Sequence, residues 1–316
     1  MIYNHIFGPV PSRRLGLSLG VEIVPYKVCS FNCIYCECGK TQNLTIERKE
    51  YIPVNEIILE LKDFLKDNPT LDFITITGSG EPTLNIGLGK IAKFIKDNYP
   101  KYKLALLTNG SLLWDKSIQE ELKYFDVVKP SLDAVSFDSL EKINNPNKFL
   151  DSNKIIEGLI DFRSNFFGQI WLEVFIIPEI NDTNKELQLL KDKITKIKPD
   201  RIQLNSIDRP PAFKNTKASS KEHLEEIRIF FEPLPVEIIS KANAKQKITV
   251  LDTDMKENII SILKRRPCTI EDLFEISGID KIKILHCIEE LKKENMIEEE
   301  TQERGVFFKM KNLIDK

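Results

Sequence analysis

The segment Cys29-Ser-Phe-Asn-Cys33-Ile-Tyr-Cys36 places three thiols in one short loop, directly after an apolar, β-rich run. A fourth cysteine, Cys38, follows at once, so four of the six cysteines in the chain are clustered. A disulfide framework spreads its cysteines along a small secreted chain, whereas clustered cysteines are more often metal ligands. Three thiolates can hold one corner of a cubane iron–sulfur cluster and leave the fourth iron open. The alternatives are three buried thiols or a zinc site, although zinc usually takes four ligands from paired CxxC motifs.

The composition indicates a globular protein. Hydrophobic residues make up 41% and charged residues 30% of the 316 residues, which is too apolar for a disordered chain. The formal net charge of -2 gives no global positive field for nucleic acid or an anionic membrane, although a local basic face can still bind nucleic acid. The beginning of the chain does not resemble a signal peptide, and no apolar run is long enough to span a bilayer. We therefore expect a cytoplasmic protein without membrane contact.

Between residues 17 and 240 the sequence alternates short apolar runs with helical patterns. The apolar runs predict strands at 17–24, 72–77, 103–108, 126–132, 170–177 and 201–207. The helical patterns lie at 54–67, 89–97, 115–124, 153–163 and 184–196. Repeated β-then-α units with short loops predict parallel strands joined by right-handed crossovers. Six units are too few for a closed eight-stranded barrel, so we expect an α/β fold: an open, partial (βα)6 barrel with its site at the carboxyl ends of the strands.

The pattern changes at residues 241–254, which we interpret as a linker. Beyond it, helical runs at 255–264, 270–277 and 281–294 precede a hairpin, which is the plan of a winged-helix domain. Thr269 with Asp272 predicts a helix N-cap, and Gly278 predicts a C-cap. We therefore expect a barrel domain at 1–240 and a small winged-helix-like domain at 255–316. The third helix carries several acidic residues, which argues against strong DNA reading.

The spacing CxxxCxxC, with Tyr35 before the third cysteine, resembles the signature of the radical S-adenosylmethionine (SAM) superfamily. This resemblance implies a radical SAM barrel and a [4Fe–4S] cluster on Cys29, Cys33 and Cys36. It also implies that SAM chelates the open iron and is cleaved reductively to a 5′-deoxyadenosyl radical. The segment GPVPSRRLG at residues 8–16 is similar to a branch grouped with tRNA wyosine synthases. Because no cysteine precedes Cys29, a second cysteine set is missing and wyosine synthesis itself is not expected.

Three further elements of the resemblance follow successive predicted strands. GSGEP at 78–82 resembles a GGEP element that receives the SAM ammonium, TNG at 108–110 resembles a TNG element, and SLD at 131–133 resembles an element near the SAM ribose. For each of them, a simple turn or cap is the alternative interpretation. The resemblance assigns cofactor contacts to Tyr35, Gly78, Gly80, Glu81, Asn109, Ser131 and Asp133.

Several other residues are candidates with open alternatives. Glu173 lies within an apolar run, where burial is costly unless the carboxylate is paired. It is either a cofactor or substrate contact or an outward-facing edge residue. Arg13 and Arg14 either clamp an anion or pair with acids across the sheet. Cys38 is a candidate catalytic residue as a hydrogen-atom donor, with an extra cluster ligand or a plain neighbour as the alternatives.

The leading functional prediction is a radical SAM enzyme that abstracts hydrogen from an unidentified substrate. The substrate could be a tRNA base, a protein or a small metabolite, and a flavodoxin or ferredoxin would supply the electron. The alternatives are an iron–sulfur redox sensor with a DNA-binding winged helix and a glycyl-radical-enzyme activator. We expect the C-terminal domain to recognise a substrate or partner and to be dispensable for SAM cleavage. The exception would be a site completed by Arg265 or Cys268 reaching back over the barrel mouth.

Overall fold

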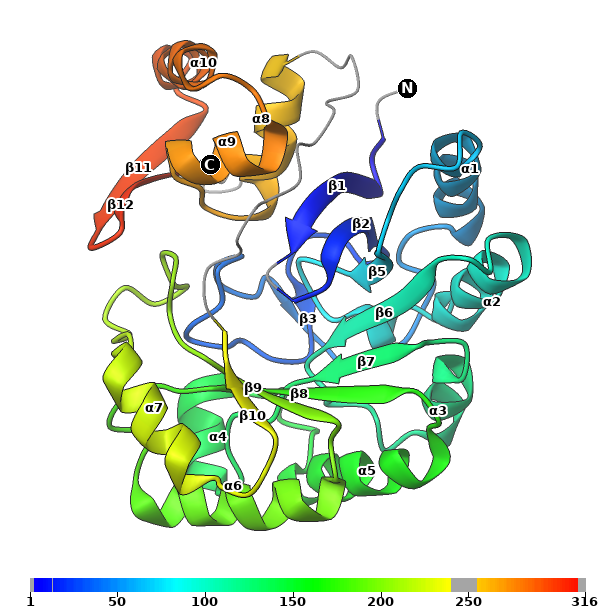
Figure 1. The fold of residues 1–316 in the computed structure, drawn as a ribbon, viewed down its shortest axis with the longest axis vertical. Coiled ribbons are helices and arrows are strands. Elements are labelled where there is room, and N and C mark those ends of the chain that lie inside the picture. Colours follow the sequence, from blue (N-terminus) through cyan, green and yellow to red (C-terminus); the bar gives the residue numbers. More distant parts are fainter. Residues whose placement is uncertain (1–2, 13, 240–254, 312–316) are drawn as a thin grey trace.

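A single eight-stranded sheet dominates the fold (Figure 1). The computed structural model describes residues 3–12, 14–239 and 255–311, so the expected linker at 241–254 lies outside the described residues. The strand order is β1-β2-β5-β6-β7-β8-β9-β10. The strands are β1 (Ile6–Ser12), β2 (Gly16–Glu22), β5 (Phe73–Thr77), β6 (Lys103–Thr108), β7 (Val127–Pro130), β8 (Gln169–Phe175), β9 (Arg201–Asn205) and β10 (Val236–Ile238). All neighbours pair in parallel except β1, which runs antiparallel to β2.

The structure confirms the α/β fold with a mainly parallel sheet, and it adds two edge strands. The sequence pattern does not predict β1, which contains Pro9 and Pro11. Proline cannot donate to a strand ladder and is tolerated at a sheet edge, where β1 lies. The other added edge strand, β10, has only 3 residues, too few for a recognisable pattern. β1 and β10 are the two ends of the strand order, so the sheet is open, as expected of a partial barrel.

Helices cover the outer face of the sheet (Figure 1). The predicted ones are α1 (Val54–Leu65), α2 (Leu88–Asn98), α3 (Lys116–Leu122), α5 (Ser152–Asn165) and α6 (Asn184–Ile197). Two more, α4 (Phe137–Asn144) and α7 (Lys221–Phe230), were not predicted. Most begin at an Asp, Ser or Thr whose side chain accepts a hydrogen bond from the first turn, which typically stabilises a helix by about 1 kcal/mol.

The inner face of the sheet changes from apolar to polar along the strands. An apolar cluster lies near the strand starts and consists of Leu15, Phe73, Ala105, Val127 and Trp171. Two residues farther along β5, β7 and β8, the same face carries the polar side chains of Thr75, Lys129 and Glu173, because side chains alternate between faces with a period of two. Ser18 and Thr75, for example, are joined through their hydroxyl oxygens at 2.6 Å. Polar groups are thus concentrated toward the carboxyl ends of the strands.

The C-terminal module has the predicted elements in the predicted order. They are α8 (Met255–Arg265), α9 (Ile270–Ser277), α10 (Lys281–Lys293) and the antiparallel pair β11 (Ile297–Gln302) and β12 (Gly305–Met310). The capping box of Thr269 with Asp272 and the C-cap at Gly278 are both confirmed. The module has its own apolar core, in which Cys268 and Cys287 are buried. Its assignment as a winged helix stays a prediction.

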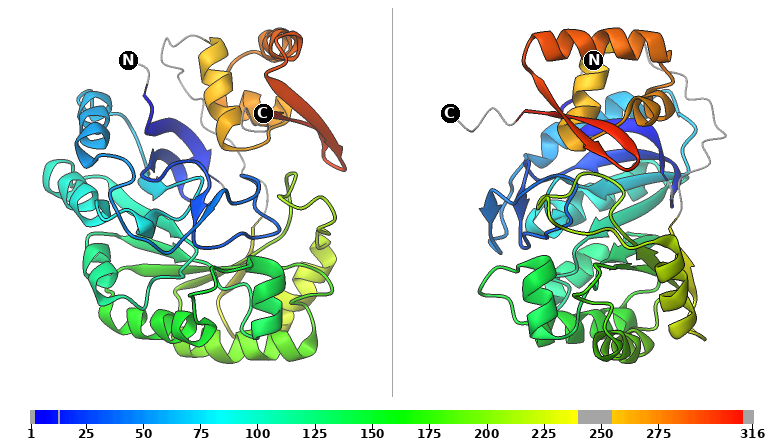
Figure 2. Two further views of the ribbon diagram at one scale, coloured as in Figure 1. Left: turned by 180° about the vertical axis from the view of Figure 1, so that it is seen from behind. Right: turned by 90° about the vertical axis from the view of Figure 1, so that its left-hand side faces the viewer.

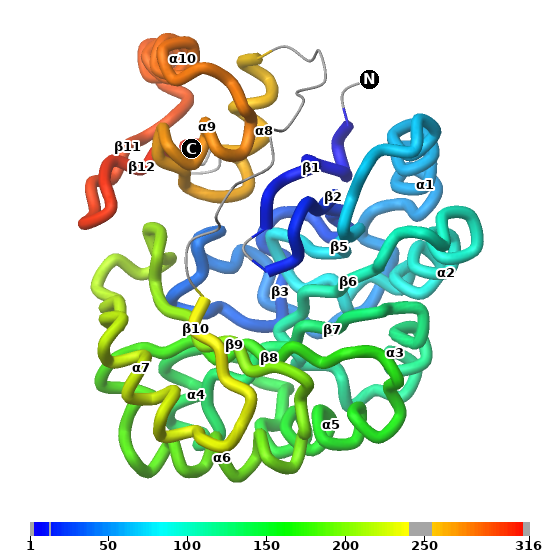
Figure 3. Tube along the Cα trace, viewed as in Figure 1, coloured from blue at the N-terminus to red at the C-terminus, as the bar shows by residue number. Residues whose placement is uncertain are grey.

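The N-terminal strands and the C-terminal module lie side by side, although they are far apart in the sequence (Figures 2 and 3). Val10 of β1 packs against the module's core. Within the described part of the chain, no helix is long and apolar enough to cross a membrane.

Candidate radical SAM site

The cysteine loop leaves the sheet after β2 and is held against the turn that follows β5. In this loop β3 (Val28–Cys29) pairs in parallel with β4 (Asn43–Leu44). The backbone N–H of Glu81 donates to the carbonyl of Val28 at 3.0 Å. Gly80 permits this approach, because a Cβ there would lie 1.9 Å from the same carbonyl oxygen. The GSGE turn and the cysteine loop therefore form one packed unit.

Each thiol of the motif faces a nitrogen donor from a different segment. The contacts are Asn109 Nδ2 with Cys29 Sγ at 3.6 Å, Asn144 Nδ2 with Cys33 Sγ at 3.4 Å, and Lys27 Nζ with Cys36 Sγ at 3.2 Å. Donors to sulfur stabilise thiolates and tune iron–sulfur clusters, so this donor set fits an anionic cluster. Among the described residues, no group of three or more His, Cys, Asp or Glu side chains is arranged to hold one metal ion. A cubane cluster differs because it places its ligands on separate irons.

The thiols differ in their pKa values. Burial raises the pKa of Cys29 to about 12 and raises that of Cys33 as well. The neighbouring Cys38 side chain, together with the Lys27 ammonium, outweighs burial and lowers the pKa of Cys36 to about 6. Metal binding deprotonates a coordinating thiol outright, so buried neutral thiols remain competent ligands.

Glu81 ties the GSGE turn to the TNG turn. Its Oε1 accepts hydrogen bonds from the backbone N–H of Thr83 at 3.0 Å and from the hydroxyls of Thr83 and Thr108, each at 2.6 Å. Its Oε2 accepts from the backbone N–H of Asn109 at 2.7 Å. The side chain is buried, and burial raises the pKa of Glu81 against the opposing effect of these neutral donors. A carboxylate oxygen with a single hydrogen bond keeps acceptor capacity, so a contact of Oε2 with the SAM ammonium stays a prediction.

Asp133 joins the SLD element to the cysteine loop. Its Oδ2 accepts from the hydroxyl of Tyr35 at 2.6 Å and from Asn144 Nδ2 at 2.7 Å. Its Oδ1 accepts from the backbone N–H of Phe175 at 2.9 Å. The ring of Tyr35 stacks on that of Phe175, with centroids 3.9 Å apart. Burial raises the pKa of Asp133 to about 6. The predicted residues Tyr35 and Asp133 are thus in direct contact.

A largely buried ion cluster lies on the inner face of the sheet. Glu173 pairs with Lys129 at 2.8 Å and with Arg14, and it also accepts from Asn205 Nδ2 at 3.2 Å. Burial would raise the pKa of Glu173, but Arg14 and Lys129 outweigh it and lower the pKa to about 2. The pKa of Lys129 also falls, to about 8, because burial and repulsion by Arg14 exceed the attraction of Glu173.

These pairs decide two of the open alternatives. Glu173 is not an outward-facing edge residue, because β8 lies between β7 and β9. Arg14 pairs with an acid across the sheet, while Arg13 lies outside the described residues. In the described structure Nε of Arg14 is buried without a hydrogen-bond partner. Two cations therefore face one carboxylate in the interior of the barrel.

The remaining predicted residues also lie close to the cysteine loop or to the carboxyl ends of the strands. Gly78 follows β5, where a Cβ would lie 2.8 Å from Val24. Ser131 follows β7 and forms a backbone bridge with Glu173. The thiol of Cys38 donates to the backbone carbonyl of Arg265 at 3.4 Å. The roles of these residues toward a ligand stay predictions.

Sequence reasoning missed two residues that contact the motif thiols. Lys27 is almost wholly buried, and its place just ahead of Cys29 was the available signal. Asn144 ends α4, a helix that the sequence pattern does not predict, so no signal was available for it.

Comparison with known proteins agrees with this geometry. Residues 23–190 match the Radical SAM superfamily. The chain belongs to this superfamily. A UPF0026 protein of Helicobacter pylori (strain J99) is 39% identical over 270 residues, which cover 84% of this chain and 86% of that protein. The chain is thus also a member of the UPF0026 group.

Two further similarities bear on domain content and fold. A protein of Brachyspira hyodysenteriae named GTPase Obg is 38% identical over 300 residues, which cover 94% of this chain but only 44% of that protein. The chain therefore spans less than half the length of this relative. A radical SAM methyltransferase from Sphaerobacter thermophilus has a similar fold, with a TM-score of 0.55 and 16% identity over 70% of this chain and 65% of that one.

Membership of the superfamily identifies the protein as an enzyme whose cofactors are SAM and a [4Fe–4S] cluster. Enzymes of this kind require a reductant. The observed donor set around the cysteine loop fits such a cluster.

Proposed function

We propose that Cys29, Cys33 and Cys36 hold the cluster and that SAM binds beside it. The contacts between the motif thiols and nitrogen donors from three segments carry this proposal. When bound, the cofactors supply reductive cleavage of SAM to a 5′-deoxyadenosyl radical, which abstracts hydrogen from the substrate.

In this proposal the chain positions the cofactors. Glu81 receives the SAM ammonium through Oε2, since a carboxylate complements an amino group. The supporting residues on the GSGE turn, the TNG turn, the SLD element and the cysteine loop are Gly78, Gly80, Asn109, Ser131, Asp133 and Tyr35. Their hydrogen bonds to one another keep the loops together, and Gly80 keeps the GSGE turn close to the cysteine loop.

The substrate would enter above the ion cluster on the inner face of the sheet. Two cations against one carboxylate favour a substrate with an anionic or hydrogen-bond-accepting group. A macromolecule, such as tRNA or a protein, is favoured by the additional C-terminal module, and an electron donor such as flavodoxin or ferredoxin would act as partner.

We also propose the domain division at 1–240, 241–254 and 255–316. Separate apolar clusters support it: one lies between the sheet and its helices, and another lies among α8, α9, α10 and the hairpin. A winged-helix-like module of this kind would act in recognition.

Cysteine variants test the proposal. The anaerobically reconstituted protein should hold about four irons and form 5′-deoxyadenosine from SAM and dithionite. Cys29→Ala, Cys33→Ala and Cys36→Ala should each abolish the electron paramagnetic signal of the reduced cluster. Cys287→Ala, a buried cysteine of the C-terminal core, is the matched control and should keep it. A wild-type signal in any motif variant removes that residue from the ligand set. A cluster without SAM cleavage would favour the sensor alternative instead.

A further inference from the structure

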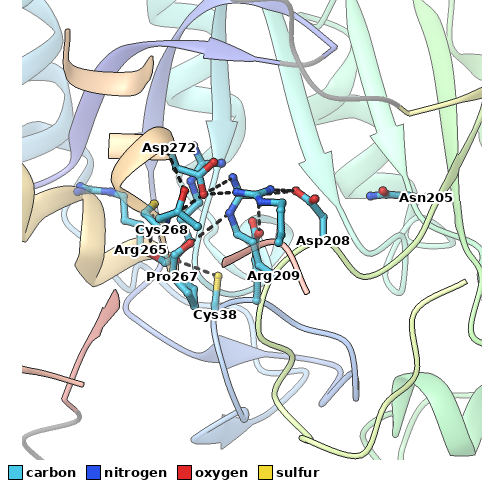
Figure 4. Close-up of polar contacts among 12 residues, drawn as sticks. Cys38, Asn205, Asp208, Arg209, Arg265, Pro267, Cys268 and Asp272 are labelled. Atoms are coloured by element: carbon cyan, nitrogen blue, oxygen red, sulfur yellow. Dashed lines mark hydrogen bonds and ion pairs between the residues drawn. The ribbon is translucent and has the colours of Figure 1, made fainter. Parts of the chain in front are cut away.

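The C-terminal module meets the barrel through charged and polar contacts that converge on the strand-end loops (Figure 4). Arg209, in the loop after β9, donates through Nε to the carbonyl of Pro267 at 3.1 Å and lies 3.6 Å from Asp272. Arg304, from the hairpin turn, pairs with both Asp272 and Asp208. Figure 4 shows Arg209 between Asp208 and Asp272. These contacts anchor the module on the side of β9.

A second set of contacts centres on Arg265, the last residue of α8. Its Nε donates to Glu22 Oε2 at 2.9 Å, and its guanidinium lies 4.4 Å from the ring centroid of Phe7. Its Nη1 donates to Ser261 Oγ at 2.6 Å and to the Ser261 carbonyl at 2.7 Å, so the guanidinium is held from its own helix. Its backbone carbonyl accepts from the thiol of Cys38 at 3.4 Å. One residue of the module thus touches both the end of β2 and the cysteine loop.

The contact of Arg265 with Glu22 continues into the GSGE turn. The other oxygen of Glu22, Oε1, accepts from the hydroxyl of Ser79 at 2.9 Å. The carbonyl of Ser79 accepts from the backbone N–H of Lys27 at 3.1 Å. Only Glu22 therefore separates Arg265 from the turn that carries Glu81.

We propose that Arg265 is a positioning residue of the SAM site, acting through Glu22 and Ser79 on the turn that presents Glu81. This rests on the proposed function of Glu81. Glu22 is mostly buried, with 16% of its side chain exposed, and Arg265 is its cationic partner. A partly buried carboxylate that loses its cation gains by turning toward water. The hydrogen bond from Ser79 to Glu22 would then break, and the GSGE turn would lose this contact on the side facing the module.

This proposal gives the C-terminal module a part in the catalytic unit. The expectation that the module is dispensable for SAM cleavage assumed that no residue of it reaches the barrel mouth. Arg265 does reach it, and Cys38 links the same residue to the cysteine loop. The module would then affect SAM binding as well as recognition of a substrate.

Substitution of Arg265 in the full chain tests the proposal. Arg265→Ala should keep about four irons and weaken SAM binding about tenfold, the effect of losing one charge-assisted hydrogen bond. Arg265→Lys should restore part of the affinity, because the charge opposite Glu22 remains. Lys264→Ala is the matched control: it removes a cation from the same helix at an exposed position and should bind SAM like the wild type.

A second measurement needs neither cluster nor SAM. In the metal-free protein, Arg265→Ala should reduce hydrogen-exchange protection of the amides of Lys27 and Glu81, which join the GSGE turn to the cysteine loop. The Lys264→Ala control should leave this protection unchanged. Unchanged protection in Arg265→Ala, together with unchanged SAM affinity, overturns the proposal.

A double-mutant cycle tests whether Arg265 and Ser79 act through the same chain of contacts or independently. Ser79→Ala removes the far end of the contact chain, so the double variant with Arg265→Ala should bind SAM about tenfold more weakly than wild type, no worse than either single variant. If the double variant instead binds SAM about a hundredfold more weakly than wild type, the two substitutions act independently, and Arg265 does not act through Ser79. If the wild type binds no SAM, the proposed function fails together with this inference. If it binds and cleaves SAM but Arg265→Ala does so equally well, only the inference fails.

Discussion

The turn after β5 and the middle of β8 each bury a glutamate on the same sheet, and the chain stabilises them in opposite ways. In the described part of the chain, Glu81 receives its hydrogen bonds from neutral donors, and burial raises its pKa. Glu173 lies between the cations Arg14 and Lys129, which lower its pKa to about 2 despite burial.

The difference lies in whether a cation already faces the carboxylate. Among the described residues, the hydrogen bonds to Glu81 come from neutral donors and none from a cation, so a cation such as the SAM ammonium would improve its electrostatic environment. The charge of Glu173 is already matched by two cations. Because two cations face this one carboxylate, the cluster carries an excess positive charge that could bind an anion. On the proposed function, the two regions would suit opposite ends of a reaction complex, with SAM at Glu81 and a substrate near Lys129.

The largest effect is expected from removing the charge of Glu173. Glu173→Gln removes the carboxylate that pairs with the buried Lys129 and the mostly buried Arg14, and breaking a buried pair costs about 3–5 kcal/mol of unfolding free energy. Urea unfolding measures this. Glu157→Gln is the control, because Glu157 forms an exposed pair with Lys193 at 3.2 Å and should change stability by less than about 1 kcal/mol. Equal effects of the two variants would contradict the assignment of a buried ion cluster.

The pH dependence of the unfolding free energy at acid pH provides a second test of Glu173. The pKa of Glu173 is lowered in the fold, so its contribution is fully present above its ordinary pKa of 4.5 and is lost as pH falls toward about 2. At about 1.4 kcal/mol for each pKa unit, this contribution is about 3 kcal/mol. The difference in unfolding free energy between wild type and Glu173→Gln should therefore narrow as pH falls from about 6 to about 3. A difference that is constant over this range would show that Glu173 titrates normally.

Periodicity in the sequence predicted most of the barrel, because buried parallel strands and amphipathic helices carry strong patterns. The strand at 103–108 and the helix at 270–277 have the predicted bounds. The pattern failed where it is short or interrupted. β1 contains two prolines, and β10 has only 3 residues.

The motif residues could be predicted, and several of their partners could not. The spacing of cysteines and the positions of glycines lie within short segments, so the sequence shows them directly. The donors at Cys33 and at Glu173 come from residues more than 100 positions away, namely Asn144 and Arg14, and only folding brings them together. The contacts of Arg265 with Glu22 and Cys38 likewise cross more than 200 positions.

The smallest expected effect lies at the other carboxylate. Glu81→Gln keeps the shape of the side chain but removes the charge proposed to receive the SAM ammonium, so SAM affinity should fall by about 1.5–3 kcal/mol while the cluster remains. Thr83→Val is the control, because it removes one neutral hydroxyl donor and leaves the carboxylate in place. Equilibrium binding of SAM to the reconstituted protein, with iron content measured in parallel, distinguishes the variants. If Glu81→Gln and Thr83→Val bind SAM equally well, Glu81 serves only to join the GSGE and TNG turns. Glu81 and Glu173 would then have different partners, but neither would bind SAM.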